Sequence, residues 1–373
     1  MTFSSPRRQA RRLFILSAIA SVALAACQTG PRRPLPTQPG APQKLEVAVL
    51  VPLSGQDSAL GESLANAAKL ALLDTGNQQI QLTVYNTAEG GAAAAANRAI
   101  AAGNRLILGP LLSEQVRAVT PLAQRAKIPV IAYSNDAQAA ADGVYILGFS
   151  PAQAIERVVL QARKQGAARF AALVPAGTYG ERSGRAFLSA VQRSGGQVAS
   201  VETYATAADA KAAARRLNNR GAFDAVLIAD GGRVAMAAAP SIRVGPRLLG
   251  TELWATDRSL GTVPRMRGAW YAAAPDARFQ QFVTRYRARY GQAPMRLASL
   301  GYDSMLLTVR AARSWQPGRR FPLRALNEPE GFAGVDGIFR FGRDNVAQRA
   351  FEVRQVTAGG STIISAAPSS FPN

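Results

Sequence analysis

The segment KLEVAVLVPLSGQDSALGESLANAAKLALLD, residues 44–74, contains the change of pattern that decides the fold. Its first part, LEVAVLV at 45–51, is a nearly unbroken apolar run with the length and β-branched content of a buried strand. Residues 61–74 then carry apolar side chains at helical spacing on one face: Leu64, Ala67, Ala68, Ala71 and Leu72. A buried strand followed directly by such a helix predicts the first half of a βαβ unit.

The same alternation continues along the chain. Further strands are predicted at IQLTVYN, RLILGP, PVIAY and VYILGF, with helices at about 91–102 and 114–126 between them. After Pro151 a second series begins with a helix to about Gln165. It continues through RFAALVP, a helix over 181–194, QVASVETY, a helix over 207–219, FDAVLIAD and RLLGT. Two α/β lobes with parallel sheets are therefore predicted.

The last part of the chain returns to helices and then to strands. Helices are predicted over 276–290 and 297–312, followed by GVDGIFRF and AFEVRQV, which we expect to pair as a final hairpin. The first of these helices has aromatic residues at helical spacing beside four arginines, which allows a nucleic-acid-binding face. The spacing favours an apolar stripe with a solvated basic back, formed by Phe279, Phe282, Val283, Tyr286 and Tyr290.

Composition excludes several classes of chemistry. The chain has no histidine and a single cysteine, Cys27, so internal disulfides, common zinc sites and Ser-His-Asp triads cannot form. Paired carboxylates could still perform acid-base catalysis, but no spacing indicates such a pair. We therefore expect neither an enzyme nor a cofactor or metal site.

Lys and Arg outnumber Asp and Glu by 44 to 23, a net charge of +21. Because the arginines are scattered over the elements, we attribute the excess to composition rather than to nucleic acid or another polyanion.

The N-terminus has the features of an exported lipoprotein. Four arginines in residues 1–12 precede an apolar run at 13–23, which is shorter than a membrane span and typical of a signal peptide. Leu24-Ala25-Ala26-Cys27 resembles a lipobox, so we expect cleavage after residue 26 and lipidation of Cys27. Residues 27–43 are rich in proline and predict a stiff tether. Arg11-Arg12 leaves both Sec and twin-arginine export open, and Gln28 favours sorting to the outer membrane.

Several segments in order resemble the type I periplasmic-binding-protein superfamily, in its Leu/Ile/Val-binding-like branch. They include LVPLSGQDSALGESLANAAKLAL, LILGPLLSEQVRAVTPLAQRAKIPVIAYSNDA, RLLGTELW and GVDGIFRFGRDN, and the likeness extends over residues 45–358. This resemblance implies two Rossmann-like lobes joined by three crossovers, with a ligand cleft between them. We expect the crossovers near 148–151, 250–252 and 327–337. Lobe 1 would then comprise 44–149 and 252–326, lobe 2 150–251 and 327–365, and a tail 366–373.

Ligands of open parallel sheets bind beyond the carboxyl ends of the strands. Small and polar residues follow the predicted strands at these positions, and together with Tyr302 they are the cleft candidates: Ser54, Gly55, Leu112, Ser113, Ser134, Asn135, Tyr179, Asp230, Gly231, Glu252 and Tyr302. In amino-acid-binding relatives the positions matching Leu112, Ser113, Ser134 and Asn135 hold the ligand carboxylate. Ser113 and Ser134 are equally explained as helix N-caps. Ser150 stands where many amino-acid binders have an acidic residue.

Within the superfamily, the lipobox together with GPLLSEQV, IAYSNDA, LLGTELW and GVDGIFRF looks most like the penicillin-binding protein activator lipoproteins. Longer members carry an additional N-terminal helical repeat domain, for which the stretch between Cys27 and Leu45 is too short. The resemblance implies a regulator on the periplasmic face of the outer membrane that contacts a class A penicillin-binding protein. The alternative is a solute receptor for an ABC importer, with an amino acid or similar small molecule in the cleft and a permease as partner.

Overall fold

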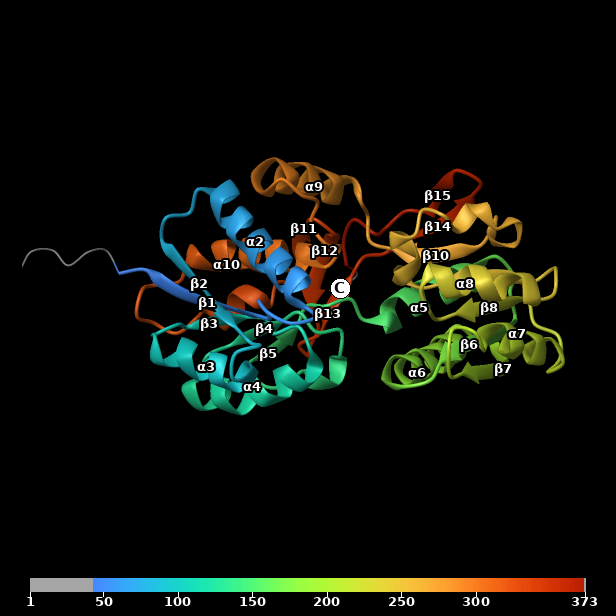
Figure 1. Ribbon diagram of the computed structural model, residues 1–373, viewed down its shortest axis with the longest axis horizontal. Helices are drawn as coiled ribbons and strands as arrows, with labels where there is room; N and C mark the ends of the chain where they lie inside the picture. Colours follow the sequence, from blue (N-terminus) through green and yellow to red (C-terminus); the bar gives the residue numbers. More distant parts are fainter. Residues whose placement is uncertain (1–42, 372–373) are drawn as a thin grey trace, which may run out of the picture. The chain divides into compact units, whose positions relative to one another are not determined.

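Strand β1 (Leu45–Val51) lies inside a five-stranded parallel sheet of order β2-β1-β3-β4-β5. We describe residues 43–371 of a computed structural model, so the expected signal peptide, Cys27 and nearly all of the expected tether lie outside the described residues. The other strands of this sheet A are β2 (Ile80–Asn86), β3 (Leu106–Leu108), β4 (Val130–Ala132) and β5 (Val144–Ile146). Sheet A forms the centre of lobe 1 (Figure 1).

Side-chain alternation in β1 separates two layers of helices. Val47, Val49 and Val51 belong to the core shared with α2 (Ser58–Thr75) and α10 (Ala298–Ala312). Ala48 and Leu50 face the opposite core, together with α3 (Gly91–Ala101) and α4 (Ser113–Ala126). Because both faces are covered, every residue of β1 except Glu46 is buried, which explains its nearly continuous apolar sequence.

The second lobe contains a seven-stranded sheet B of order β15-β14-β10-β9-β8-β6-β7. Its parallel part consists of β6 (Arg169–Pro175), β7 (Gln197–Tyr204), β8 (Ala225–Ile228), β9 (Arg247–Gly250) and β10 (Trp270–Ala273). Two antiparallel strands, β14 (Glu352–Thr357) and β15 (Gly360–Ser365), extend one edge. One face packs on α5 (Pro151–Lys164) and α6 (Thr178–Arg193), the other on α7 (Ala210–Asn218) and α8 (Gly232–Ala238).

The C-terminal strands differ from the expected hairpin. GIFRF forms β12 (Gly337–Phe341), which pairs with β11 (Phe332–Gly334) and β13 (Ala347–Arg349) in a small antiparallel sheet C. The second expected partner forms β14 instead, between β10 and β15 in sheet B. The prediction was wrong because period-two alternation identifies strands but does not specify their partners.

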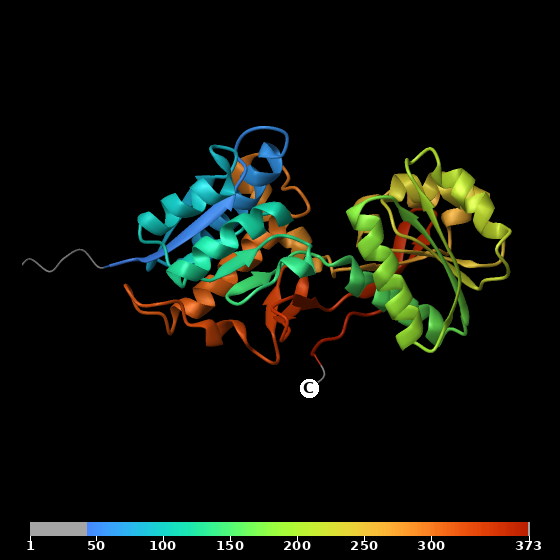
Figure 2. The same cartoon turned by 90° about the horizontal axis from the view of Figure 1, so that it is seen from below.

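The boundaries of the lobes also differ from those expected. Because β10 pairs with β9, the chain remains in lobe 2 until about Ala273, beyond the expected crossover at 250–252. Sheet C adjoins lobe 1, where Val346 bridges to Ile146 of β5, so the expected assignment of all of 327–365 to lobe 2 is also wrong. The chain thus passes between the lobes after β5, after β10 and after β13 (Figures 1 and 2).

The aromatic stripe of α9 (Ala277–Tyr290) packs into lobe 1, as the sequence predicts. Phe279, Phe282 and Tyr286 are buried, and the Phe282 ring lies 5.1 Å from that of Tyr302 on α10. Val283 and Tyr290 pack against the same core. The apolar-stripe interpretation of this helix is therefore confirmed over the nucleic-acid alternative.

Candidate functional site

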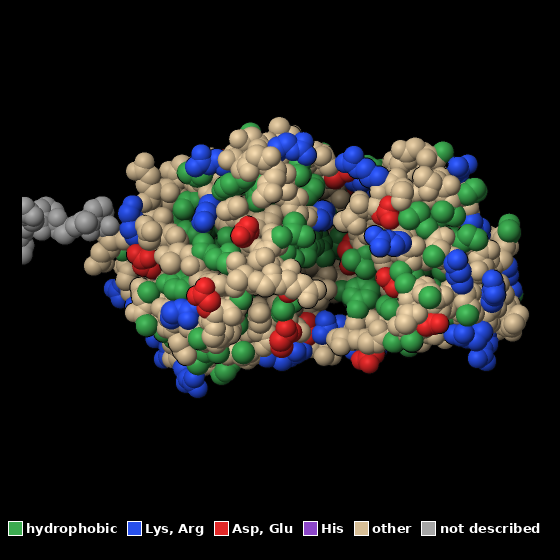
Figure 3. All heavy atoms as spheres, in the orientation of Figure 1, with side chains coloured by type: hydrophobic (Ala, Val, Ile, Leu, Met, Phe, Trp, Pro, Cys, Tyr) green, Lys and Arg blue, Asp and Glu red, His purple; other side chains and the backbone are tan. Residues whose placement is uncertain are grey.

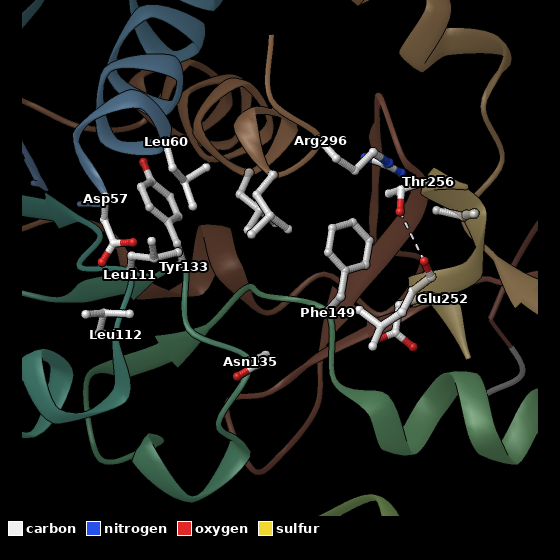
Figure 4. A pocket seen from close by; sticks show the side chains of 15 residues that line it. Asp57, Leu60, Leu111, Leu112, Tyr133, Asn135, Phe149, Glu252, Thr256 and Arg296 are labelled. Carbon is white, nitrogen blue, oxygen red and sulfur yellow. Dashed lines mark hydrogen bonds between the residues drawn. The ribbon is translucent and has the colours of Figure 1, made fainter. Parts of the chain in front are cut away.

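A cavity of about 430 Å³ lies between the two lobes, beyond the carboxyl ends of several strands. Lobe 1 contributes residues that follow β3, β4 and β5, and lobe 2 contributes the segment after β9. Figure 4 shows the lining side chains and the elements that carry them, and Figure 3 shows the surface hollowed between the lobes. This placement agrees with the general position of ligand sites in open parallel sheets.

The wall of the cavity is largely apolar. Leu111, Leu112 and Tyr133 come from the ends of β3 and β4, and Phe149 lies on the crossover after β5. The remaining apolar lining is Leu60, Leu253, Ala255, Ala274, Leu297 and Leu300. The Tyr133 hydroxyl is directed to Ser304, 3.1 Å away, rather than left without a partner. Such a wall suits a ligand with a substantial apolar part.

Glu252 is the acidic group that the cavity presents from lobe 2. It begins the 3₁₀ turn η3 (Glu252–Thr256), in which the N–H of Leu253 donates to the hydroxyl of the N-cap residue Thr251. The Oε2 atom is covered and has no hydrogen-bond partner among the described residues. Burial raises the pKa of this carboxyl to about 7. The group is therefore equipped either to accept a proton or to pair with a cation or donor that enters the cavity.

Other candidates of lobe 2 gather beside Glu252. The Tyr204 hydroxyl donates to Asp230 Oδ2 at 2.6 Å, and the indole of Trp254 donates to the Asp230 carbonyl at 3.0 Å. Tyr179 lies 3.4 Å from the Thr251 hydroxyl, and burial followed by the charge of Glu252 raises the Tyr179 pKa. Gly231 donates its N–H to the Asp230 carboxylate. These residues form a hydrogen-bonded floor rather than a free set of ligand donors.

Arg296 is the cationic group of the cavity wall, but it already has partners. Its guanidinium pairs with Asp336 at 2.7 Å and lies over the rings of Phe149 and Phe279, at 5.4 and 4.1 Å from their centroids. Behind it, burial and then the charge of Asp336 raise the pKa of Asp303. The wall is therefore supported by a buried charge network that includes Arg349, whose guanidinium donates to the Leu147 carbonyl at 2.8 Å.

An ion pair crosses between the lobes near the cavity. Asp136, which follows β4 in lobe 1, is fully buried and pairs at 2.7 Å with Arg182 of α6 in lobe 2. Arg117 of α4 pairs with the same carboxylate from within lobe 1. The second oxygen, Asp136 Oδ1, accepts the N–H of Gln138. We call Asp136 with Arg182 the clasp, because it joins the lobes at the edge of the cleft.

Apart from Ser113, Ser134 and Tyr302, the predicted cleft residues divide into three groups. Leu112, Asn135 and Glu252 line the cavity. Tyr179, Asp230 and Gly231 lie behind Glu252, in the hydrogen-bonded floor of lobe 2. Ser54 and Gly55, in the loop after β1, do not line the cavity: the Ser54 hydroxyl accepts from Asn86 at 3.3 Å, and Gly55 has a φ of 81°.

The two serines that were expected to hold a carboxylate do not line the cavity. Ser113 is the first residue of α4, and its hydroxyl accepts from Arg117 at 3.4 Å. The buried Ser134 hydroxyl accepts the N–H of Asp136 at 3.1 Å, which stabilises the turn that presents the clasp. Neither serine acts as a helix N-cap: Leu112 occupies that position of α4, and Ser134 lies in the turn after β4. Ser150 is the N-cap residue of α5, without a side-chain cap.

Tyr302 does not belong to the cavity, so this prediction was wrong. Its hydroxyl donates to Asp74 at 2.7 Å at the end of α2 and accepts from Arg285 of α9 at 3.1 Å. Conversely, Phe149 and Arg296 were missed. Phe149 ended the expected strand VYILGF but lies on the irregular crossover beyond β5, and Arg296 lies on an irregular segment before α10. Both reach the cavity because chain segments about 150 residues apart in sequence meet there.

Between residues 43 and 371, no helix has the length and apolar content needed to cross a bilayer. In the same range, no group of three Cys, Asp or Glu side chains is arranged to hold a metal ion.

The comparison with known families settles the class of protein. Residues 44–361 match a family model described as periplasmic binding protein. The chain belongs to that family. Its α/β fold with two mainly parallel sheets is the type I periplasmic binding fold, so the fold class and the superfamily expected from the sequence are confirmed. The family consists of binding proteins.

Solved structures of this family share the fold over most of the chain. A putative branched-chain amino acid ABC transporter protein from Rhodospirillum rubrum has 19% identity and a TM-score of 0.76, covering 86% of this chain and 100% of its own. The leucine binding protein LivK from Thermotoga maritima has 21% identity and a TM-score of 0.64, and the match covers 87% of this chain and 98% of that protein. Full-length LpoA from Haemophilus influenzae has 19% identity and a TM-score of 0.66, and the match covers 87% of this chain and 60% of LpoA.

A curated relative matches only part of the sequence. An uncharacterized protein of Rickettsia prowazekii is 27% identical over 170 residues, which is 45% of this chain and 46% of that protein. The chain thus spans about half the length of the curated relative it matches. At these identities the comparisons establish family and fold, and the activity has to be argued from the site.

Proposed function

We propose that this periplasmic binding protein is a lipid-anchored regulator that activates a class A peptidoglycan synthase by protein contact. Cys27 would carry the lipid, residues 28–43 would hold the body off the outer membrane, and the cleft would not deliver a solute. The observation that carries this proposal is the state of the cleft. Ser113 and Ser134, the hydroxyls expected to bind a carboxylate, are not in its lining, while the clasp already joins the lobes.

A free amino acid needs a partner for its carboxylate as well as for its ammonium group. Ser113 and Ser134 lie outside the cavity lining, and Arg296, the cation in the wall, is already paired with Asp336. Replacing that partner by a ligand would leave the fully buried Asp336 carboxylate without its 2.7 Å ion pair, at a cost of several kcal/mol. The cleft is therefore poorly built for a zwitterion.

The clasp also argues against a receptor, because it bears on how the two lobes move. In a receptor, ligand contacts drive closure of the two lobes, and the open and closed states are presented differently to the permease. Here Arg182 and Asp136 supply a contact between lobes that needs no ligand. LpoA, a penicillin-binding protein activator lipoprotein, shares this fold, which makes a regulatory role on the same scaffold reasonable.

The second candidate is a receptor for an ABC importer, and one observation favours it. The apolar cavity and the unpartnered Oε2 of Glu252 together suit a small molecule that carries an apolar group and a cationic or donor group. Both candidates share one fold, so an experiment on the cleft has to separate them.

The test combines a synthase assay with a ligand screen, using residues 44–373 and the double variant Asn135→Ala, Glu252→Gln. We expect both proteins to stimulate glycan polymerisation by a purified class A synthase equally, because the contact surface lies outside the cleft. A calorimetric screen of amino acids, short peptides and muropeptides should give no saturable binding. Micromolar binding of a free amino acid that the double variant abolishes would establish the receptor instead. Absence of stimulation by the unaltered protein would overturn the regulator.

A further inference from the structure

The end of lobe 2 opposite the cleft carries a cluster of arginines. Glu252 follows β9 at the cleft, so the beginnings of β9 and β10 lie at the other end of sheet B. Arg243 and Arg247 precede or begin β9, and Arg265 and Arg267 precede β10. We call these four residues the arginine end. In Figure 3, Lys and Arg side chains are visible over the part of lobe 2 that carries α7 and α8.

The four guanidinium groups are held by backbone carbonyls. Arg243 donates to the Gly221 carbonyl and Arg247 to the Gly268 carbonyl, both at 2.6 Å. Arg265 donates to the carbonyls of Arg243 and Pro246 at 3.0 and 2.9 Å, and Arg267 donates to that of Gly261 at 2.9 Å. Among residues 43–371, none of the four forms an ion pair with a carboxylate.

Other arginines of the same lobe are neutralised. Arg216 and Arg220 both pair with Glu202, and Arg169 pairs with Asp224. Asp224 adjoins Arg247 at the same end of sheet B, but its carboxylate is occupied by Arg169 and by the backbone N–H groups of Ala168 and Arg169. The arginine end is therefore distinct in that its four guanidinium groups have no carboxylate partner among the described residues. This contrast separates the cluster from the general excess of arginine in the composition.

The cluster is also rigid and internally repulsive. Arg243 lies 4.1 Å above the ring of Phe223, and Arg247 lies 4.5 Å above that of Trp270, so aromatic faces and carbonyls together fix the planar groups. Burial and then the charge of Arg247 lower the pKa of Arg265. Guanidinium groups that are oriented in advance and lack counter-charges are suited to bidentate contacts with carboxylates or phosphates.

We propose that the arginine end binds a polymer that presents repeated carboxylates, of the chemistry of the peptidoglycan stem peptides. The choice of this polymer rests on the proposed function, whereas the demand for an anion rests on the cluster alone. A lipid surface fits less well, because an inserted face needs several exposed apolar residues. In the two loops that carry the four arginines, the exposed large apolar residue is Val244, with 89% of its surface accessible.

The position of the arginine end suits such a partner. Leu45 begins β1 at the end of sheet A that is remote from the cleft, and the arginine end is at the remote end of sheet B. Within the unit from Lys44 onward, the point where the chain enters and the cationic surface therefore lie on opposite lobes (Figure 1). An attachment through Lys44 would therefore be made to the lobe that does not carry the arginine end.

The experiment measures co-sedimentation of residues 44–373, the compact unit that holds all three sheets, with purified peptidoglycan sacculi. The test variant is Arg247→Gln, Arg267→Gln, which removes two exposed charges and retains side chains that can donate to carbonyls. The matched control is Arg105→Gln, Arg125→Gln, two exposed arginines of lobe 1 with the same change in charge. We expect about tenfold weaker binding for the test variant and unchanged binding for the control.

Several results would overturn this inference. They are equal binding by the test variant, an equal loss in the control, no binding of the unaltered protein to sacculi, or binding to phosphatidylglycerol vesicles in place of sacculi. A thermal melt of each variant verifies that the fold is retained. Synthase stimulation, measured without sacculi on the same variants, keeps the two proposals apart: stimulation without wall binding refutes only the arginine end, and wall binding without stimulation refutes only the regulator.

Discussion

At the scale of single residues, Glu252 is the group whose ionisation should be visible in stability. Burial raises its pKa to about 7 in the folded protein, from 4.5 in the unfolded chain. Below pH 4.5 both states hold the proton, and as the pH rises to 7 the unfolded state releases it first. The protonated carboxyl therefore stabilises the fold at low pH, and this contribution is lost as the pH rises through 7.

We accordingly expect Glu252→Gln to be more stable than the unaltered protein at pH 8, by up to roughly 3 kcal/mol, and nearly equal to it at pH 4.5. Urea unfolding of both proteins at the two pH values measures this difference. Burial also raises the pKa of Asp303, so deprotonation of both Asp303 and Glu252 should reduce the stability of the unaltered protein as the pH rises. Subtracting the curve of the variant isolates Glu252, and a pH-independent difference between the two proteins would contradict the assignment.

Glu252 is one of three cavity residues that could be predicted from the sequence. Leu112, Asn135 and Glu252 could be predicted because the ends of parallel strands converge at one edge, wherever the strands themselves are recognised. Tyr302 was misplaced because its segment forms a helix whose hydroxyl-bearing face packs on α2 and α9. Phe149 and Arg296 lie on irregular segments, and their approach depends on the tertiary arrangement of both lobes.

At the scale of elements, the packing of α10 on α2 depends on a glycine. A Cβ atom at Gly301 would overlap the carbonyl oxygen of Leu64, a backbone atom in the middle of α2. Gly301→Ala should therefore separate the two helices and reduce stability by about 1–3 kcal/mol, as overpacked core substitutions do. Thermal or urea unfolding measures the change.

A second glycine provides the control for this prediction. Gly184 lies within α6, and a Cβ atom there would contact nothing within 4 Å. Gly184→Ala should raise stability by about 0.5–1 kcal/mol, since alanine loses less backbone freedom in a helix. Equal effects of the two substitutions would show that helix propensity, rather than the close approach of α2 and α10, determines the result at Gly301.

The elements themselves were the part of the fold most accessible from sequence. Long periodic segments such as Leu45–Val51 and the longer helices of both lobes were predicted within a few residues, because local burial imposes their pattern. The short helix α8, of seven residues, was not predicted. The errors are at the C-terminal end, where β10 to β15 are short and pair across the sheets. Strand β10 (Trp270–Ala273) is only four residues long, and it belongs to sheet B because it pairs with β9 and β14.

At the scale of the whole molecule, the clasp should set the arrangement of the lobes. Arg182 is the partner that lobe 2 supplies to the buried Asp136, while Arg117 of lobe 1 contacts the same carboxylate. In Arg182→Gln the charge of Asp136 therefore keeps a counter-ion, so lobe 1 should stay folded. What the variant loses is the clasp, whereas the ion pair of Arg354 with Asp276, beside the crossover after β10, remains.

We expect Arg182→Gln to broaden and lengthen the distances between spin labels attached through Arg125→Cys on α4 and Arg185→Cys on α6. Residues 44–373 contain no other cysteine, so the two labels report only this pair. Arg193→Gln is the matched control, because Arg193 pairs with Glu156 within lobe 2. Unchanged distances in Arg182→Gln would show that the crossovers alone hold the lobes. Lengthened distances that an added amino acid restores would instead indicate a cleft that closes on a ligand, and would favour the receptor.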